Sequence, residues 1–368
     1  MKIRAAVTRQ PGAEFAIEEV SLDDPRDDEI LVRIEAVGIC HTDLIFRETV
    51  GQFGRPAVLG HEGAGIVEKV GANVTKVRPG DKVLLTFRSC GECSRCAMDK
   101  PAYCENLALL NFSGMRPDGS TAIASDGMSI ASNFFGQSSF ASHVLAYERN
   151  VVKIDAALPS AVYAPLGCGV QTGAGAVLRS LQCRPGASIV VIGGGAVGLS
   201  AVMATALLDC DPIILIEPRP ERRKLALEIG ATIALDPFGE PVGERIKDVA
   251  QAGVDYVFDS SGVISAIEGA MEWLATDGSI GLVAAPMDPA ASLAVPLFSA
   301  VTRGISVKGI VEGDSDPDVL IPELIAHHRA GRFPFDRLIS TYPFDQINHA
   351  VEDQHSGRCL KAVLTFGD

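Results

Sequence analysis

The sequence predicts an α/β protein with two domains, one rich in β-strands and one built on a doubly wound parallel sheet. The chain has 368 residues, more than one hydrophobic core usually serves. Short β patterns broken by turns dominate residues 1–90, as in a small barrel-like β domain. From residue 187, strands alternate with helices, which is the pattern of a parallel sheet covered by helices.

The β-rich part begins at the N-terminus, where residues 1–7 have the pattern of a first strand rather than of a secretion signal. Residues 30–37 and 64–70 predict further strands, and Pro79 and Gly80 predict a turn. Two glycine-bounded segments interrupt this pattern, Gly38-Ile39-Cys40-His41-Thr42-Asp43 and Gly60-His61-Glu62-Gly63-Ala64-Gly65. Functional residues are common on such loops and helix ends.

Cys40 and His61 are candidate metal ligands on these two segments. A thiolate and an imidazole suit zinc, and a catalytic zinc site leaves one position open for water or substrate. The carboxylates of Asp43 and Glu62 are placed to orient the ligands and tune the charge. The alternative is an ordinary buried cysteine and histidine in the core.

Four further cysteines, Cys90, Cys93, Cys96 and Cys104, fall within fifteen residues. Four thiolates close a tetrahedral coordination sphere, so this cluster predicts a structural zinc rather than a catalytic one. An iron–sulfur cluster and a reactive redox cluster are the rival interpretations. The chain has nine cysteines and no secretion signal, so we expect a cytoplasmic protein without disulfides.

Residues 111–140 predict a long loop that ends in Phe134, Phe135 and Phe140, which either line a pocket or pack under the loop. Cys168 follows between two glycines. Taken by itself, Cys168 fits a small core residue in a tight turn.

The strongest motif follows a predicted strand at residues 187–192 and opens a helix that runs through Leu208. Gly193, Gly195 and Gly198 match GxGxxG, where the glycines admit a pyrophosphate and the helix N-terminus supplies amide donors. The next strand, residues 212–216, ends at Glu217, 19 residues after Gly198, where an acid holds the ribose hydroxyls.

Glu217 favours NAD over NADP, because its carboxylate repels a 2′-phosphate. Arg219, Arg222 and Arg223 weaken this preference, since arginine can accept that phosphate.

Further strands and helices continue the alternation, with strands at residues 231–234, 254–259 and 279–283 and helices at 221–229 and 264–274. Residues 306–311 predict an edge strand, which invites pairing with another chain. A helix at 319–328 and strands at 339–344 and 360–366 return to the β-rich material. We therefore expect the first domain to span 1–169 and 312–368, and the second 170–311.

Composition excludes several classes of function. The net charge of −14 comes with no basic block, which argues against a nucleic-acid partner. No run of 18 residues is apolar and free of charges or turn signals, so we expect no membrane span.

Taken together, these motifs resemble the zinc-dependent medium-chain alcohol dehydrogenases over nearly the whole chain. The resemblance implies a GroES-like catalytic domain and a Rossmann domain that binds NAD. It places Cys40, His61 and Cys168 on the catalytic zinc and the four-cysteine cluster on the structural zinc, two zinc ions per subunit. It also places Glu62 behind the catalytic zinc, and Thr42 and His41 beside it.

The resemblance assigns further residues to the dinucleotide, namely Thr172, Val197, Arg222, His41 and Lys361, the last two near the pyrophosphate. Two positions depart from the family pattern. Ile45 replaces the histidine that ends a proton relay in some members, so the relay would run from Thr42 through the cofactor ribose or by way of His41. Thr86 replaces a bulky aromatic residue, which leaves room for a ring-bearing substrate.

Within the family, residues 135–140 and 166–176 look most like the aryl-alcohol (benzyl-alcohol) dehydrogenases. The resemblance implies reversible oxidation of primary aromatic or allylic alcohols, including terpenoids such as geraniol, to aldehydes. A glutathione-dependent formaldehyde dehydrogenase is one alternative, and an inactive binding protein of the same fold is another. A homodimer or homotetramer is expected through the edge strand at Ser306 to Val311, and the site is expected in a cleft between the domains.

Overall fold

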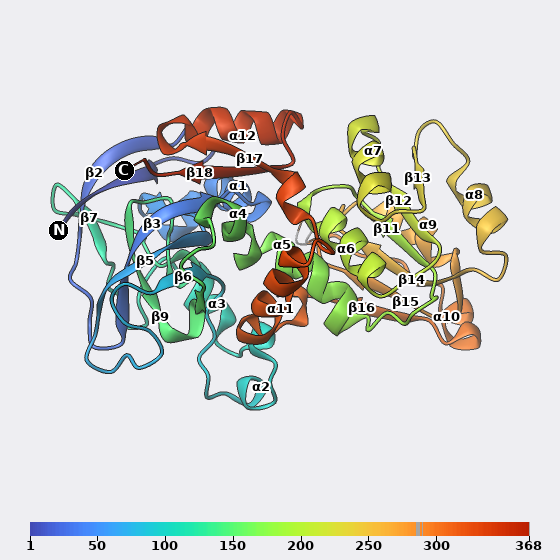
Figure 1. Cartoon of the computed structure of the whole chain (residues 1–368), viewed down its shortest axis with the longest axis horizontal. Coiled ribbons are helices and arrows are strands. Elements are labelled where there is room, and N and C mark those ends of the chain that lie inside the picture. Colours follow the sequence, from blue (N-terminus) through green and yellow to red (C-terminus); the bar gives the residue numbers. More distant parts are fainter. Residues whose placement is uncertain (285–287, 289, 368) are drawn as a thin grey trace. The chain divides into compact units, whose positions relative to one another are not determined.

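The computed structural model describes residues 1–284, 288 and 290–367, and it divides into two compact units (Figure 1). The first unit comprises residues 1–168, 316–325 and 336–368. The second unit comprises residues 169–315 and 326–335. Gly169 and residues 312–315 and 326–335, which were predicted to belong to the first domain, cluster instead with the second unit.

Two antiparallel-rich sheets form the first unit. One has the order β4-β1-β2-β7-β8. The other has the order β10-β6-β5-β3-β18-β17, with β9 also paired to β3. The strands are β1 Lys2–Thr8, β2 Ala16–Leu22, β3 Glu29–Gly38, β4 Ala57–Val58, β5 Glu62–Val70, β6 Lys82–Leu85, β7 Ile123–Ser125, β8 Met128–Ile130, β9 His143–Tyr147, β10 Val151–Ile154, β17 Ile339–Pro343 and β18 Lys361–Thr365.

Strand β3 is the centre of the larger sheet. Its alternating aliphatic residues lie in a hydrophobic core that includes Ile30, Val32 and Ile34. It pairs antiparallel with β5 on one side, where Gly38 lies opposite Glu62, and with the C-terminal strand β18, where Gly38 lies opposite Val363. This register brings residues from both ends of the chain to the end of β3 that precedes Cys40.

The helices of the first unit are short and lie in its connections. They are α1 His41–Glu48, α2 Ser94–Ala97, α3 Leu107–Phe112, α4 Ser160–Tyr163 and α12 Ile347–Ser356, and α11 Pro317–Arg329 continues into the second unit. The segment predicted as a loop, residues 111–140, contains the strands β7 and β8 in addition to irregular structure.

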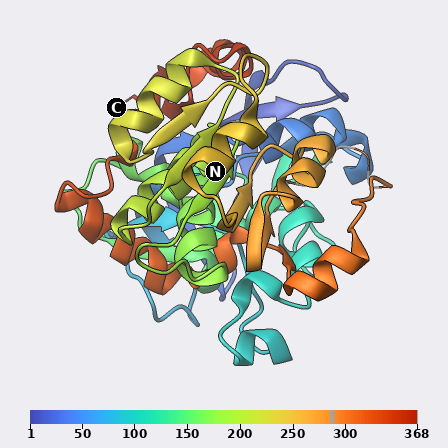
Figure 2. The same cartoon turned by 90° about the vertical axis from the view of Figure 1, so that its right-hand side faces the viewer.

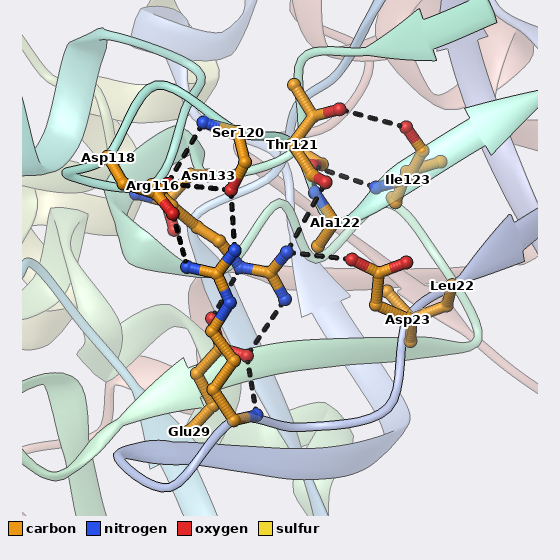
Figure 3. Close-up of polar contacts among 12 residues, drawn as sticks. Leu22, Asp23, Glu29, Arg116, Asp118, Ser120, Thr121, Ala122, Ile123 and Asn133 are labelled. Atoms are coloured by element: carbon orange, nitrogen blue, oxygen red, sulfur yellow. Dashed lines mark hydrogen bonds and ion pairs between the residues drawn. The ribbon is translucent and has the colours of Figure 1, made fainter.

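A buried ion cluster ties this long connection to the sheets (Figure 3). Arg116 donates two hydrogen bonds to Glu29, at 2.7 and 2.9 Å, and one to Asp23 at 2.8 Å. The side chains of Arg116 and Glu29 are only 3% and 1% exposed. Buried charges need partners, so this pair holds the segment after α3 against the start of β3.

The second unit is a six-stranded parallel sheet of order β13-β12-β11-β14-β15-β16. Helices flank it, as Figure 2 shows. The elements are β11 Ile189–Ile192, β12 Ile213–Ile216, β13 Ile233–Leu235, β14 Val254–Asp259, β15 Leu274–Leu282, β16 Ser306–Gly309, α5 Gly169–Gly175, α6 Ala196–Leu207, α7 Pro220–Ile229, α8 Val242–Val249, α9 Ile264–Met271 and α10 Leu297–Arg303.

The doubly wound sheet predicted from sequence is confirmed in this unit. Strands β11 and β12 are fully buried aliphatic runs, and β14, which also carries aromatic and acidic residues, is almost fully buried, as expected for strands covered on both faces. Within the described residues, β16 is the last strand of the order and all four of its residues are exposed. None of the described helices combines the length and apolar character needed to cross a bilayer.

The Arg116–Glu29 pair provides a test of the first unit's stability. Replacing Arg116 with methionine should lower the free energy of unfolding by about 3 kcal/mol, because Glu29 then remains buried without its charge partner. Urea unfolding followed by circular dichroism measures this. The control is Arg26→Met, which removes an exposed pair with Asp118 and should cost about 1 kcal/mol or less. Equal losses in the two variants would contradict a special role for the buried pair.

Candidate active site

The first element of the site is the carboxylate of Asp43, which is fully buried in the first turn of α1. One of its oxygens accepts the backbone N–H of Cys40 at 2.9 Å. The other accepts the N–H of Gly60 at 3.0 Å and lies 2.9 Å from Nδ1 of His61. This carboxylate therefore joins the two glycine-bounded segments and holds the proton of His61 on Nδ1.

With Nδ1 engaged by Asp43, Nε2 of His61 is the ring nitrogen left to bind a metal, and it is buried without a hydrogen-bond partner among the described residues. Ligand atoms of Cys40, His61, Glu62 and Cys168 all lie within 4.8 Å of one another. An orphaned imidazole nitrogen facing two thiols is the donor set that zinc prefers. A hydrogen bond with Cys168 is the main cause that holds the pKa of Cys40 well below its usual value, although burial opposes it.

Cys168 reaches this cluster because Gly167 lets the backbone pass close to β6. A Cβ atom at Gly167 would lie 2.3 Å from the carbonyl oxygen of Leu85. The local sequence pattern predicted that Cys168 is a core residue, and the family resemblance predicted that it is a zinc ligand. Both predictions imply a buried thiol. Only its position beside Cys40 and His61 shows that it can share a metal with them.

Glu62, the carboxylate of this cluster, pairs with Lys361 at 2.5 Å, both side chains being almost fully buried. Lys361 also donates to the carbonyl oxygen of Ile39 at 2.9 Å. Gly38 makes room for this carboxylate, since a Cβ there would lie 1.9 Å from Glu62 Oε2. Burial is the main cause that raises the pKa of Glu62, and the ammonium of Lys361 opposes the rise.

The resemblance placed Lys361 near the cofactor pyrophosphate. In the structure its ammonium already has the Glu62 carboxylate and a backbone carbonyl as partners within the first unit. Lys361 is therefore the counter-charge to Glu62 within the first unit. This pairing follows from the register of β18 against β3, which the linear sequence does not display.

Aromatic side chains cover the other side of His61. The ring of Phe135 stacks on the imidazole with centroids 4.3 Å apart, and Phe134 meets it edge-on at 5.5 Å. Phe112 packs edge-on against Phe135, and Phe46 packs on both Phe112 and Phe134. The phenylalanines predicted either to line a pocket or to pack under the loop are all buried in the core, with Phe134 and Phe135 against the imidazole and Phe140 against Phe15.

Gln137 is a buried residue to which the sequence analysis assigned no role. Its amide donates to the carbonyl oxygens of His61 and Thr86 at 2.9 and 3.0 Å, and its oxygen accepts the N–H of Gly63. Phe135 reaches its place with a left-handed backbone, φ 52°, next to Gly136. The glycine is the only local sign in the sequence of this unusual turn.

The residues proposed for proton transfer lie at the start of α1. The hydroxyl of Thr42 is half-buried and lies 3.8 Å from the sulfur of Cys40. His41 is exposed, whereas Ile45 is half-buried one turn further along. Thr86 is buried, and its hydroxyl donates to the carbonyl oxygen of Gly167 at 2.7 Å.

The second cluster brings together the ligand atoms of Cys90, Cys93, Cys96 and Cys104, again within 4.8 Å. Sulfur pairs Cys90–Cys96 and Cys93–Cys104 are 3.9 Å apart, too far for disulfides. Backbone N–H groups of Cys90, Cys93 and Glu105 point at sulfurs of the cluster. Although burial opposes it, donation from backbone N–H groups helps lower the pKa of Cys90 to about 6. The four sulfurs fit a closed tetrahedral zinc site.

In the second unit, Gly193 turns the chain after β11 with φ 94°, and α6 begins at Ala196. A Cβ at Gly198 would lie 1.9 Å from the carbonyl oxygen of Gly193, so the turn requires glycine there. Glu217 is 3% exposed and accepts the N–H of Gly194 at 2.6 Å and that of Arg219 at 2.9 Å. Gly195 is the N-cap of α6.

The remaining predicted cofactor residues also lie in the second unit. Arg222 approaches Glu217 at 3.9 Å. Val197 is half-buried in the first turn of α6. Thr172 is 6% exposed in α5, with its hydroxyl 3.4 Å from the carboxylate of Glu312.

A parallel sheet with this turn, together with a group of Cys and His side chains that could hold zinc, is the combination expected of a metal-dependent dehydrogenase that uses a dinucleotide. Comparison with known proteins agrees. Residues 26–156 match the alcohol dehydrogenase GroES-like domain, and residues 196–326 match the zinc-binding dehydrogenase domain.

Three relatives give the degree of similarity. The geraniol dehydrogenase of Castellaniella defragrans is 44% identical over 99% of this chain and 97% of its own length. The structure of benzyl alcohol dehydrogenase from Acinetobacter calcoaceticus covers both chains completely, with 38% identity and a TM-score of 0.96. The class-3 alcohol dehydrogenase of Myxine glutinosa is 31% identical over 98% of this chain and 97% of its own length. The chain therefore belongs to the zinc-dependent alcohol dehydrogenase family.

The Asp43 contacts lead to a prediction about metal affinity. Asp43→Asn should weaken zinc binding at the Cys40 site by about 10- to 100-fold, because the amide cannot supply the negative charge that orients and polarises His61. Zinc transfer to a colorimetric chelator measures this as a faster release of one of two ions. Asp24→Asn, at an exposed carboxylate, is the control and should release zinc as the wild type does. Unchanged release from Asp43→Asn would contradict the assignment.

Proposed function

We propose that this protein is an NAD-dependent alcohol dehydrogenase that reversibly oxidises primary aromatic or allylic alcohols, of the benzyl alcohol or geraniol type, to aldehydes. The observation that carries this is the aromatic wall of Phe46, Phe112, Phe134 and Phe135 beside the His61 imidazole. Phe134 and Phe135 are buried, so ring and alkene carbons of a substrate would pack on the half-buried Phe46 and Phe112. The relatives named for geraniol and benzyl alcohol support the same substrate class.

Cys40, His61 and Cys168 are the proposed ligands of the catalytic zinc, and Glu62 is the carboxylate behind it. When bound there, zinc supplies a Lewis acid that lowers the pKa of an alcohol hydroxyl. Asp43 keeps the His61 ring in place and its Nε2 free. Lys361 compensates the charge of Glu62, so that a second carboxylate can stay near the two thiolates.

The hydroxyl of Thr42 is the proposed proton acceptor, because it lies next to Cys40 and remains partly accessible. The aliphatic side chain of Ile45 cannot carry the proton further. We therefore propose that it leaves through the cofactor ribose or by way of the exposed His41. The buried rings of Phe134 and Phe135 keep water away from the side of His61 on which they pack.

Preference for NAD follows from the position of Glu217. Its carboxylate is buried and held by two backbone amides, so it cannot swing away from a phosphate on the adenosine ribose. A 2′-phosphate would meet this fixed negative charge. Gly193, Gly195, Gly198, Val197, Arg222 and Thr172 are the other proposed cofactor residues of the second unit.

A substrate and cofactor panel tests the proposal. Turnover of benzyl alcohol and geraniol with NAD should exceed turnover of ethanol and of S-hydroxymethylglutathione, and NAD should give the higher kcat/KM than NADP. Spectrophotometry of the reduced cofactor measures each rate. Preference for S-hydroxymethylglutathione would select the formaldehyde dehydrogenase alternative. No turnover of any alcohol by fully metal-loaded protein would select the inactive binding protein.

We also propose that the protein forms a homo-oligomer, at least a dimer, through the edge of the second unit. Leu297, Phe298 and Val301 of α10 are 73%, 84% and 80% exposed, and β16 lies at the neighbouring sheet edge. Such an apolar patch beside an unpaired sheet edge suits a symmetric partner.

The clusters of free thiols suit a reducing compartment, and we propose that the protein is located in the cytoplasm.

Introducing a charged residue into the apolar patch of α10 tests whether this patch forms the proposed oligomer interface. Phe298→Glu should shift the mass in solution toward the monomer, because the carboxylate would be buried without a partner. Analytical ultracentrifugation at micromolar concentration reports the mass. Phe238→Glu is the matched control, since Phe238 is 88% exposed elsewhere in the same unit and should leave the mass unchanged. A wild-type protein that is monomeric would refute this part of the proposal.

A further inference from the structure

The first unit contains a cavity of about 400 Å³ that has no part in the proposed reaction. Its wall joins the four-cysteine segment, represented by Cys90 and Asn106, to the loop after β6 and to the residues that follow β9. A volume in this range accommodates a small molecule. The polar groups of its wall therefore decide which kind of molecule would fit.

Arg88 is the most unusual group in this wall. Its guanidinium lies over the ring of Tyr147, with Cζ 3.3 Å from the centroid. Across the described part of the chain, no carboxylate comes within ion-pair distance of it, and its Nη1 is buried without a hydrogen-bond acceptor. Burial is the main cause that lowers its pKa. Arginine remains charged even so, and the negative charges of Asp28 and Glu29 act on it from beyond ion-pair distance.

The nearby carboxylate of Glu29 does not supply the missing partner. Its oxygens already accept hydrogen bonds from Arg116, from the hydroxyl of Tyr147 and from the backbone N–H of Arg26. The carboxylate of Glu148, which lines the cavity, accepts hydrogen bonds from the backbone N–H groups of Thr75 and Lys76. The carboxylates of Glu29 and Glu148 therefore already accept hydrogen bonds from donors other than Arg88.

Arg149 provides a second guanidinium in the same wall. It donates only to the hydroxyl of Ser89, at 3.1 and 3.3 Å, and the described residues offer it no ion pair. Its Nε would lie 3.3 Å from a Cβ at Gly91, so it rests against the backbone of the four-cysteine segment. Two arginines with free donor capacity on one cavity match the oxygens of an anion.

The other residues that line the cavity limit which kind of anion can bind there. Asp28 and Glu92 are exposed acids of the cavity and disfavour a doubly charged ligand such as phosphate. Leu110 is buried and Leu109 is 49% exposed, and together they give the cavity an apolar side. A single negative charge with a short apolar body satisfies both features.

We infer that this cavity is a binding site for a small organic monocarboxylate, whose oxygens accept from Arg88 and Arg149 and whose apolar part lies on Leu109 and Leu110. This function is separate from the oxidation of alcohols and does not depend on it. Because Cys90 and Asn106 share the wall, a bound carboxylate links the four-cysteine segment to the sheets and restrains it.

Hydrogen–deuterium exchange on the zinc-loaded, full-length protein tests the site, with sodium benzoate as the probe. Benzoate should slow exchange in residues 88–92, 104–110 and 147–150, whether or not it also protects residues 40–46 near the catalytic cluster. The neutral analogue benzamide should not protect these segments. The benzoate concentration for half-protection should rise at least about tenfold in both Arg88→Met and Arg149→Met.

Arg149 is exposed, so its variant keeps the test valid if Arg88→Met fails to fold. Arg95→Met is the matched control, because Arg95 is an exposed arginine of the same four-cysteine segment outside the cavity wall. It should retain wild-type protection. The inference is overturned if benzoate leaves the three segments unprotected, if benzamide or inorganic phosphate protects them as well as benzoate does, or if Arg95→Met weakens protection as much as Arg149→Met.

Discussion

The carboxylate of Asp43 is the interaction on which the candidate active site depends. It is fully buried, and its two oxygens accept from the backbone of Cys40, the backbone of Gly60 and the ring of His61. Leaving a buried carboxylate unpaired is costly, so all three donors are held together once the chain is folded. One side chain therefore sets the start of α1, the position of the histidine loop and the tautomer that leaves Nε2 free.

Two other buried carboxylates of the first unit also have charged partners. Glu62 is buried against Lys361, and Glu29 is buried against Arg116. Each pair joins segments that are distant in sequence: Lys361 lies on the last strand, and Arg116 lies after the four-cysteine segment. Buried charge pairs are strongly destabilised when one partner is lost, so they specify how these segments meet. The guanidinium of Arg88 differs from these pairs, and that difference is what points to an anion from outside the chain.

Much of the fold was predictable because its signals are local. The glycine turn after residues 187–192, the acid at Glu217 and the alternation of strands and helices identified the dinucleotide-binding sheet, since its periodicity and turn chemistry operate over a few residues. The Cys90–Cys104 spacing predicted a metal-binding segment for the same reason. Short elements such as β7, β8 and α5 were missed, because tertiary pairing rather than local pattern stabilises them.

By itself, the sequence determined the chemical types available: two groups of metal-binding side chains, a phosphate-binding turn and an acid for the ribose. Only the tertiary structure decided which of these side chains meet. Cys168 comes within ligand distance of Cys40 and His61, Lys361 turns to Glu62, and Phe135 lies flat on the imidazole. These contacts arise from strand register, from close backbone approach at Gly38 and Gly167 and from a left-handed turn at Phe135, and none of these is a property of residues near one another in sequence.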